Sequence, residues 1–389
     1  MRSSGTATAL PDGAGLLHVG MPKTGTTALQ AALFDARPQL RELGVRNVSR
    51  GRHDMRVALT AAGTLPPYWD TEPFATRWQQ LSERFRTSTD RCTIWSSETL
   101  TQAGPERVRY LADQLRRDGH EVHVVLTLRA LAPLLASQWQ EVLRRRGTDP
   151  LDVWLHRHFD AVDLDGTTHV TWTRVMPELH RLSLRRVLQE WGPVFGEDRI
   201  TFVVGEPSDR LFNLRVFEGL MGVPEGTLLL QDLDNASLPY PEAEMVRHFN
   251  LAYTEGGGDH ATWMYTVGGP GQLALRELTG LAPYPIRTPR WAARRANEYV
   301  EGWIEAVEAS DARVIGDLAN LLVDPEDHPD DTTPPETVSV ASAGRIAEIL
   351  FASGLEHDPA TAATLEGTSG RELLREVGRR VRGRIGRRA

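Results

Sequence analysis

The sequence predicts an α/β protein, doubly wound around a mostly parallel sheet, with a mainly helical C-terminal extension. Two observations predict this fold class. Short apolar runs alternate with helical patterns over residues 14–240, which is the order expected of a layered α/β domain. Beyond about residue 240 the strand signal fades and helical patterns dominate.

The predicted strands are continuous apolar runs rich in β-branched residues, as in a parallel sheet that helices cover on both faces. They occupy residues 15–21, 92–97, 121–128 and 199–205. Helical spacing is found at residues 26–36, 74–86, 105–117, 131–145, 211–221, 291–308 and 340–351. We therefore expect an α/β core over residues 14–240, a helical extension over 241–370 and an arginine-rich tail over 371–389.

Composition and charge place the chain among ordinary globular proteins. No apolar run approaches the roughly 18 residues of a membrane span, and the N-terminus has no signal-like core, so a cytoplasmic location is expected. The tail carries eight arginines against two glutamates, which suits a weak contact with acidic membrane lipid, although a frayed end in solvent is the simpler interpretation. We expect no nucleic-acid partner, and the sequence leaves the oligomeric state open.

Cysteine and lysine are each represented by one residue. Cys92 lies in an apolar run, which predicts a buried structural thiol and excludes an internal disulfide or a multi-cysteine zinc site. Lys23 is the only lysine among 44 basic residues. A composition so biased towards arginine would place arginine at an ordinary surface position. The exception therefore indicates a site that needs a compact ammonium group.

Lys23 lies in a loop whose residues are suited to binding an anion. The segment HVGMPKTGTTALQ, residues 18–30, joins a predicted strand to a predicted helix that begins at Thr26. Unpaired backbone N–H groups and the positive end of the helix dipole meet at such a junction. Thr26 and Thr27 add hydroxyl groups, and Lys23 adds a mobile positive charge.

The nucleotide triphosphatase P-loop is the nearest alternative. Gly20 and Gly25 fit the glycine spacing of G-x-x-x-x-G-K-[ST]. Thr26, however, stands where that motif requires lysine, and Lys23 lies three residues earlier. A divergent P-loop kinase or nucleotide triphosphatase is therefore the second function that the sequence allows.

The motif PKTGTT resembles the 5′-phosphosulfate loop of the sulfotransferases that use 3′-phosphoadenosine 5′-phosphosulfate (PAPS). The resemblance extends over roughly residues 14–240 and implies a P-loop NTPase-like sheet of the kind found in bacterial members of the family. It implies that the loop surrounds the 5′-phosphosulfate of PAPS, with Lys23 next to the oxygen that separates from sulfur. The residues to which this role carries over are Pro22, Lys23, Thr24, Gly25, Thr26 and Thr27.

A second segment, residues 124–146, again has the form of a strand followed by a helix. Arg129 stands at the strand end, and Ser137 follows eight residues later. Arginine can bind a phosphate through two parallel hydrogen bonds. In the sulfotransferases an arginine and a serine at this spacing bind the 3′-phosphate, so the resemblance assigns this role to Arg129 and Ser137.

Sulfuryl transfer needs a general base for the acceptor hydroxyl. Glu98 is the first candidate, because it follows directly on a predicted buried strand, at the sheet edge where ligands bind. His53, on a loop before a helix, is the second, because histidine titrates near neutral pH. Both could instead be structural, Glu98 as a helix-start charge or salt-bridge partner and His53 as a capping or surface residue.

No metal site is expected, because the histidine pairs at His120/His123 and His156/His158 lack a convincing constellation. Because a sulfuryl group carries less charge than a phosphoryl group, we expect the loop and Lys23 to suffice without Mg²⁺. The sequence therefore predicts a sulfotransferase that moves a sulfuryl group from PAPS to a hydroxyl or amine. The acceptor, a small molecule such as a saccharide, glycolipid or natural product, is not identified, and the helical extension is expected to contribute to its side of the site.

Overall fold

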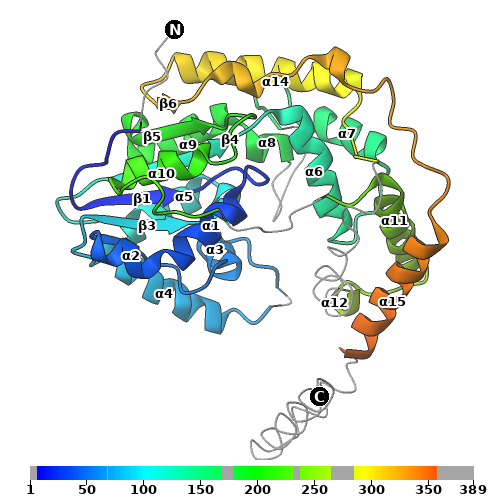
Figure 1. The fold of residues 1–389 in the computed structure, drawn as a ribbon, viewed down its shortest axis with the longest axis horizontal. Helices are drawn as coiled ribbons and strands as arrows, with labels where there is room; N and C mark the ends of the chain where they lie inside the picture. Colours follow the sequence, from blue (N-terminus) through cyan, green and yellow to red (C-terminus); the bar gives the residue numbers. More distant parts are fainter. Residues whose placement is uncertain (1–6, 68, 169–177, 231–236, 264–283, 357–389) are drawn as a thin grey trace, which may run out of the picture. The chain divides into compact units, whose positions relative to one another are not determined.

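A computed structural model describes residues 7–67, 69–168, 178–230, 237–263 and 284–356. The described residues form an α/β protein whose sheet has six strands, all parallel (Figure 1). This confirms the predicted α/β class and the parallel sheet. The strands are β1 (Ala14–His18), β2 (Val45–Asn47), β3 (Cys92–Ser96), β4 (Val122–Leu128), β5 (Ile200–Val204) and β6 (Arg313–Ile315).

The strand order is β2-β3-β1-β4-β5-β6, so the chain starts in the middle of the sheet. From β1 it passes to the edge strand β2 and returns to β3, which lies between β2 and β1. It then builds outwards on the other side through β4, β5 and β6. The direction of winding reverses between β1 and β4, which are neighbours in the sheet. In open parallel sheets a crevice opens at such a reversal, beyond the carboxyl ends of the two strands.

Helices cover both faces of the sheet. On one face, the core contains Leu29 from α1, Leu40 from α2 and Phe217 from α10, packed against Leu16 and Ile94 of the strands. On the other, α4 packs against β3 and α9 against β4, with α5 between these two helices. The helices of this part are α1 (Thr26–Asp35), α2 (Arg37–Glu42), α3 (Met55–Ala62), α4 (Glu72–Arg86), α5 (Pro105–Leu115), α6 (Leu131–Leu143), α7 (Leu151–Asp160), α8 (Glu178–Leu182), α9 (Leu184–Phe195), α10 (Phe212–Met221) and α14 (Arg290–Glu308).

Short 3-10 turns join several of these elements. They are η1 (Glu98–Gln102), η2 (Glu197–Arg199), η5 (Leu318–Leu321) and η6 (Pro325–Asp327). The first of them begins two residues after the end of β3, so it starts at the carboxyl edge of the sheet.

The chain divides into two compact units. The unit that contains the sheet takes residues 1–139, 149–234 and 286–333, so α14 and β6 belong with the strands. The second unit takes residues 140–148, 235–285 and 334–389. Its described helices are α11 (Tyr240–Glu255), α12 (His260–Trp263) and α15 (Val340–Glu356).

Within the second unit, Asn250 of α11 anchors the segment that follows α6. Its amide nitrogen donates to the carbonyl oxygens of Leu143, at 2.7 Å, and Gly147, at 2.9 Å. None of the helices among the described residues combines the length and apolarity needed to cross a membrane. The arginine-rich tail, residues 371–389, lies outside the described residues.

Candidate functional site

The predicted anion-binding loop lies at the winding reversal of the sheet. It leaves the carboxyl end of β1 and leads into α1. Beyond the end of β1 the chain still follows β4, because the N–H groups of Val19 and Met21 donate to Val125 and Thr127 at 3.0 Å each. The residues from Pro22 onwards then turn away from the sheet edge. The loop and the end of β4 therefore border the same crevice.

Three residues of the loop have the left-handed backbone conformation: Gly20 (φ 38°), Lys23 (φ 66°) and Gly25 (φ 86°). A side chain at Gly20 would place its Cβ 2.7 Å from the Thr26 methyl group, so only glycine fits there. Thr24, between Lys23 and Gly25, has a negative φ. Such alternation turns successive N–H groups towards a common side and forms a concave anion site.

The same loop forms the start of α1. The carbonyl oxygen of Gly25 accepts from the N–H groups of Ala28 and Leu29 at 3.1 Å each, so Gly25 is the N-cap residue. The first N–H groups of a helix have no partner within the helix, and the helix dipole adds partial positive charge there. Thr26 is buried and Thr27 is exposed.

Lys23 is unusual because lysine rarely adopts the left-handed conformation, which costs roughly 1–2 kcal/mol for a residue other than glycine. Arg129 contributes to fixing it, since its Nη1 donates to the Lys23 carbonyl oxygen at 3.0 Å. Arg129 follows directly on β4, so this bond joins the two strand ends that border the crevice. The structure thus brings together Lys23 and Arg129, two of the residues that the sequence singled out.

Arg129 remains able to bind an anion. Its side chain is exposed, and its hydrogen bond to Lys23 uses one of the five N–H groups of the guanidinium. Desolvation by the surrounding protein lowers the pKa of Arg129, but the ordinary value is so high that the group stays charged. The site therefore has two cations and a helix N-terminus at one edge of the sheet.

A buried chain of hydrogen bonds supports the loop from below. Thr24 donates to the Met21 carbonyl oxygen at 2.7 Å, and its hydroxyl lies 2.7 Å from that of Thr127. His18 Nε2 lies 3.2 Å from the Thr127 hydroxyl, and His18 Nδ1 lies 2.7 Å from the Ser96 hydroxyl. The chain connects β1, β3 and β4 to the loop.

The series of hydrogen bonds ends at the Met21 carbonyl oxygen, which can only accept. This end fixes the donor and the acceptor in each of the other bonds. Thr24 donates to Met21, so Thr127 donates to Thr24. His18 Nε2–H then donates to Thr127, and Ser96 donates to the unprotonated Nδ1. Burial lowers the pKa of His18 to about 3, so the imidazole is neutral and every polar atom of the chain has a partner. The hydroxyl of Thr24 is therefore used inside the protein, and its N–H is the group left for an anion.

Two further contacts involve residues that the sequence assigned to phosphate binding. Asn213, in the first turn of α10, donates from its amide nitrogen to the Thr24 carbonyl oxygen at 3.2 Å and supports the loop from a third side. Ser137, on α6, donates to the Pro133 carbonyl oxygen of its own helix at 3.3 Å. Its hydroxyl would have to rotate away from this bond to meet a phosphate.

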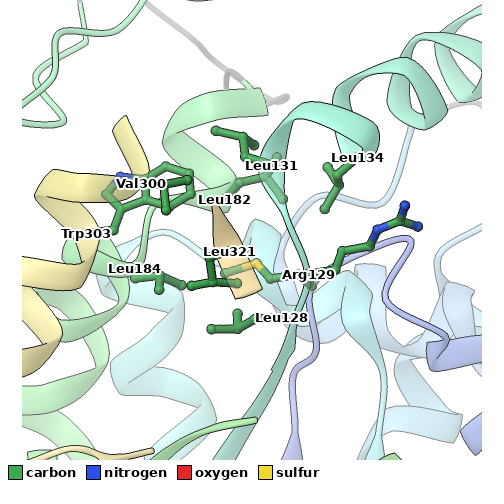
Figure 2. A pocket seen from close by; sticks show the side chains of 10 residues that line it. Leu128, Arg129, Leu131, Leu134, Leu182, Leu184, Val300, Trp303 and Leu321 are labelled. Atoms are coloured by element: carbon green, nitrogen blue, oxygen red, sulfur yellow. The ribbon is translucent and has the colours of Figure 1, made fainter. Parts of the chain in front are cut away.

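A small apolar cavity lies beside Arg129. Its volume is about 20 Å³, which is room for about one water molecule. Arg129 forms part of its edge, and its guanidinium extends away from Leu128, Leu184 and Leu321 (Figure 2). The cavity is therefore too small to hold a donor or acceptor molecule. Its lining residues are Met21, Leu128, Arg129, Leu131, Leu134, Leu182, Leu184, Val300, Trp303 and Leu321.

The two candidates for the general base, His53 and Glu98, come together in space. His53 Nε2 lies 3.9 Å from Glu98 Oε1. Gln30 of α1 connects them, because its Nε2 donates to Glu98 Oε2 at 2.7 Å and its Oε1 lies 2.6 Å from His53 Nδ1. Sequence reasoning missed Gln30. Its position four residues after Thr26, and so on the same helix face, was the one available signal.

No group of three or more metal-ligating side chains occurs among the described residues. The site therefore consists of the loop, Lys23, Arg129 and the group formed by Gln30, His53 and Glu98. Comparison of the chain with protein-family models, with curated proteins and with solved structures gives no match.

Proposed function

We propose that this protein is a sulfotransferase that moves a sulfuryl group from PAPS to a hydroxyl or amine of an acceptor. The observation that carries the proposal is the anion-binding loop. The loop presents Lys23, the single lysine of the chain, at the winding reversal of a parallel sheet. The carbonyl oxygen of Lys23 accepts a hydrogen bond from Arg129. The resemblance of PKTGTT to the phosphosulfate loop of sulfotransferases supports the same function.

The residues present fit the charges of the donor. The N–H groups of residues 24–27 and the start of α1 would bind the 5′-phosphosulfate, as backbone donors bind phosphates in P-loop proteins. Arg129 would bind the 3′-phosphate, with Ser137 as a second donor once it releases the Pro133 carbonyl oxygen. The P-loop-like character of the fold is part of this proposal and rests on the loop and on the strand order.

The proposed transfer breaks the bond between sulfur and the bridging phosphate oxygen and forms a bond between sulfur and the acceptor oxygen. Negative charge develops on the bridging oxygen, where Lys23 and the helix N-terminus would stabilise it. The acceptor proton passes to a general base. The products are the sulfated acceptor and 3′-phosphoadenosine 5′-phosphate (PAP).

Ligand-dependent thermal unfolding tests the donor. PAP at 100 times its dissociation constant should stabilise the protein by about 2.7 kcal/mol, whereas ATP with Mg²⁺ should not. The opposite pattern would identify a divergent P-loop kinase or nucleotide triphosphatase. Transfer of labelled sulfate from PAPS to a panel of saccharides, glycolipids and aromatic hydroxyl compounds would identify the acceptor.

Substitution of Lys23 tests the loop. Lys23→Ala should lower turnover far more than it lowers the affinity for PAP, because the ammonium acts on charge that develops during transfer. Lys23→Arg is the matched control for charge. It keeps the cation but not the compact ammonium, so it should restore little activity. Equal turnover of wild type and Lys23→Ala would contradict the assignment.

A further inference from the structure

Gln30 is almost fully buried, with an exposed fraction of 5 %, and its two amide ends point to different partners. An ionised carboxylate only accepts hydrogen bonds, so the amide nitrogen of Gln30 must face Glu98. The carbonyl oxygen of Gln30 then faces His53 Nδ1 at 2.6 Å. An amide oxygen also only accepts, so His53 must have its proton on Nδ1.

This arrangement leaves a lone pair on His53 Nε2. In water a neutral imidazole prefers the other tautomer, with the proton on Nε2, so Gln30 selects the less common form. Nε2 lies 3.9 Å from Glu98 Oε1, too far for a hydrogen bond but close enough to stabilise an imidazolium. The lone pair on His53 Nε2 is therefore available to accept a proton.

Exposure distinguishes the two candidate bases. The His53 side chain is 40 % exposed and that of Glu98 is 17 % exposed. One oxygen of Glu98 already accepts from Gln30. An acceptor molecule arriving from solvent therefore meets His53 first. This assigns proton transfer to His53 and the supporting charge to Glu98.

Neighbouring charges are engaged elsewhere. Arg52 pairs with Asp35 at 2.9 Å, and Asp54 accepts from the backbone N–H of Arg50 at 3.0 Å. Of the described groups beside His53, Glu98 is the charge that the structure pairs with its imidazole. The position of Gln30 on α1, four residues after Thr26, puts this group about 6 Å along the helix from the anion-binding loop.

We propose that Gln30 is a positioning residue that fixes His53 in the Nδ1–H tautomer, so that Nε2 can take the proton of the acceptor hydroxyl. Glu98 orients Gln30 and stabilises the imidazolium that results. The proton therefore moves from the acceptor oxygen to His53 Nε2 as the new oxygen–sulfur bond forms. The base role rests on the proposed sulfotransferase function, whereas the tautomer is a property of the protein alone.

The tautomer is measured by ¹⁵N NMR of the imidazole rings, with His53→Asn identifying the signal of His53. Wild type should show a protonated Nδ1 and an unprotonated Nε2. Gln30→Met, which keeps the size of the side chain but removes both hydrogen bonds, should lose this preference. Gln138→Met is the matched control, because Gln138 is also a buried glutamine, with an exposed fraction of 3 %. It should leave the His53 signal unchanged.

A double exchange separates positioning from general disruption. In Gln30→Glu with Glu98→Gln, the new carboxylate accepts from both His53 Nδ1–H and the new amide, so the tautomer should be restored. For sulfuryl transfer, Gln30→Met should lower kcat by about 10- to 100-fold, with the KM for PAPS within about twofold of wild type. The double exchange should recover most of this loss.

Two results would overturn the proposal: a proton on His53 Nε2 in the wild type, or an unchanged kcat in Gln30→Met. Failure of the proposed function has a different signature. A wild-type protein that neither binds PAP nor transfers sulfate from PAPS refutes that function and the base role with it. The ¹⁵N spectra decide the positioning role of Gln30 in either case.

Discussion

Thr127 is the residue through which the buried hydrogen-bond chain reaches the anion-binding loop. Its hydroxyl accepts from His18 Nε2–H at 3.2 Å and donates to the hydroxyl of Thr24, 2.7 Å away. Thr127→Val keeps the shape of the side chain and removes this hydroxyl. Thr127 has an exposed fraction of 1 %, so no solvent would replace the lost partner of His18.

The cost follows from these contacts. Each buried neutral hydrogen bond contributes about 1 kcal/mol net, and a buried donor left without a partner costs a further 1–3 kcal/mol or so. Part of this cost is recovered if His18 moves its proton to Nδ1 and donates to Ser96. We therefore expect Thr127→Val to lower the free energy of unfolding by about 2–4 kcal/mol. It should also weaken PAP binding, because Thr24 loses a donor that fixes the loop.

Urea unfolding at neutral pH measures the first effect, and calorimetric titration with PAP measures the second. Thr127→Ser is the matched control, because it loses a methyl group but keeps the hydroxyl. Its stability should lie closer to wild type than that of Thr127→Val. If the valine variant is as stable as wild type, or more stable than the serine variant, the hydrogen-bond chain does not support the loop as described.

Three further predictions concern single residues. The pKa of His18 is lowered from 6.5 to about 3, so the unfolded chain binds a proton that the folded protein excludes. The contribution of neutral His18 to the free energy of unfolding is therefore complete above pH 6.5, and it is lost at about 1.4 kcal/mol per pH unit as the pH falls towards 3. Urea unfolding between these pH values should show that the free energy of unfolding of His18→Gln depends less steeply on pH than that of wild type. Gly20→Ala should abolish PAP binding, because the added Cβ would lie 2.7 Å from the Thr26 methyl group, whereas calorimetry on Gly119→Ala, which has φ 75° and no atom near the added Cβ, should show normal binding. Burial raises the pKa of Cys92 to about 12, so its thiol should react with iodoacetamide only after unfolding, and rapid labelling of the native protein would contradict this.

The interior of the sheet could be predicted from the sequence, but its edges could not. β1, β3, β4 and β5 are continuous apolar runs, and the structure places each within three residues of its predicted ends. β2 and β6 have three residues each and contain Arg46 and Arg313, so no apolar run marks them. β6 follows α14 in the stretch where helices alone were expected, and it pairs with β5 at the edge of the sheet.

The loop could be predicted because its chemistry is local in sequence. Glycine spacing, Lys23 and the start of α1 all lie within residues 18–30. The group formed by Gln30, His53 and Glu98 could not be predicted, because its members come from α1, the segment before α3 and the start of η1. From the sequence, His53 and Glu98 were alternative candidates for the general base. Their juxtaposition depends on tertiary packing, which the pattern of neither segment reveals.

The crystal structure of the protein with PAP bound tests the central claim most directly. The 5′-phosphate should lie against the N–H groups of residues 24–27, with the ammonium of Lys23 in contact with it and the 3′-phosphate at Arg129. A nucleotide bound away from the carboxyl ends of β1 and β4, or a loop that closes without a phosphate in it, would contradict the account.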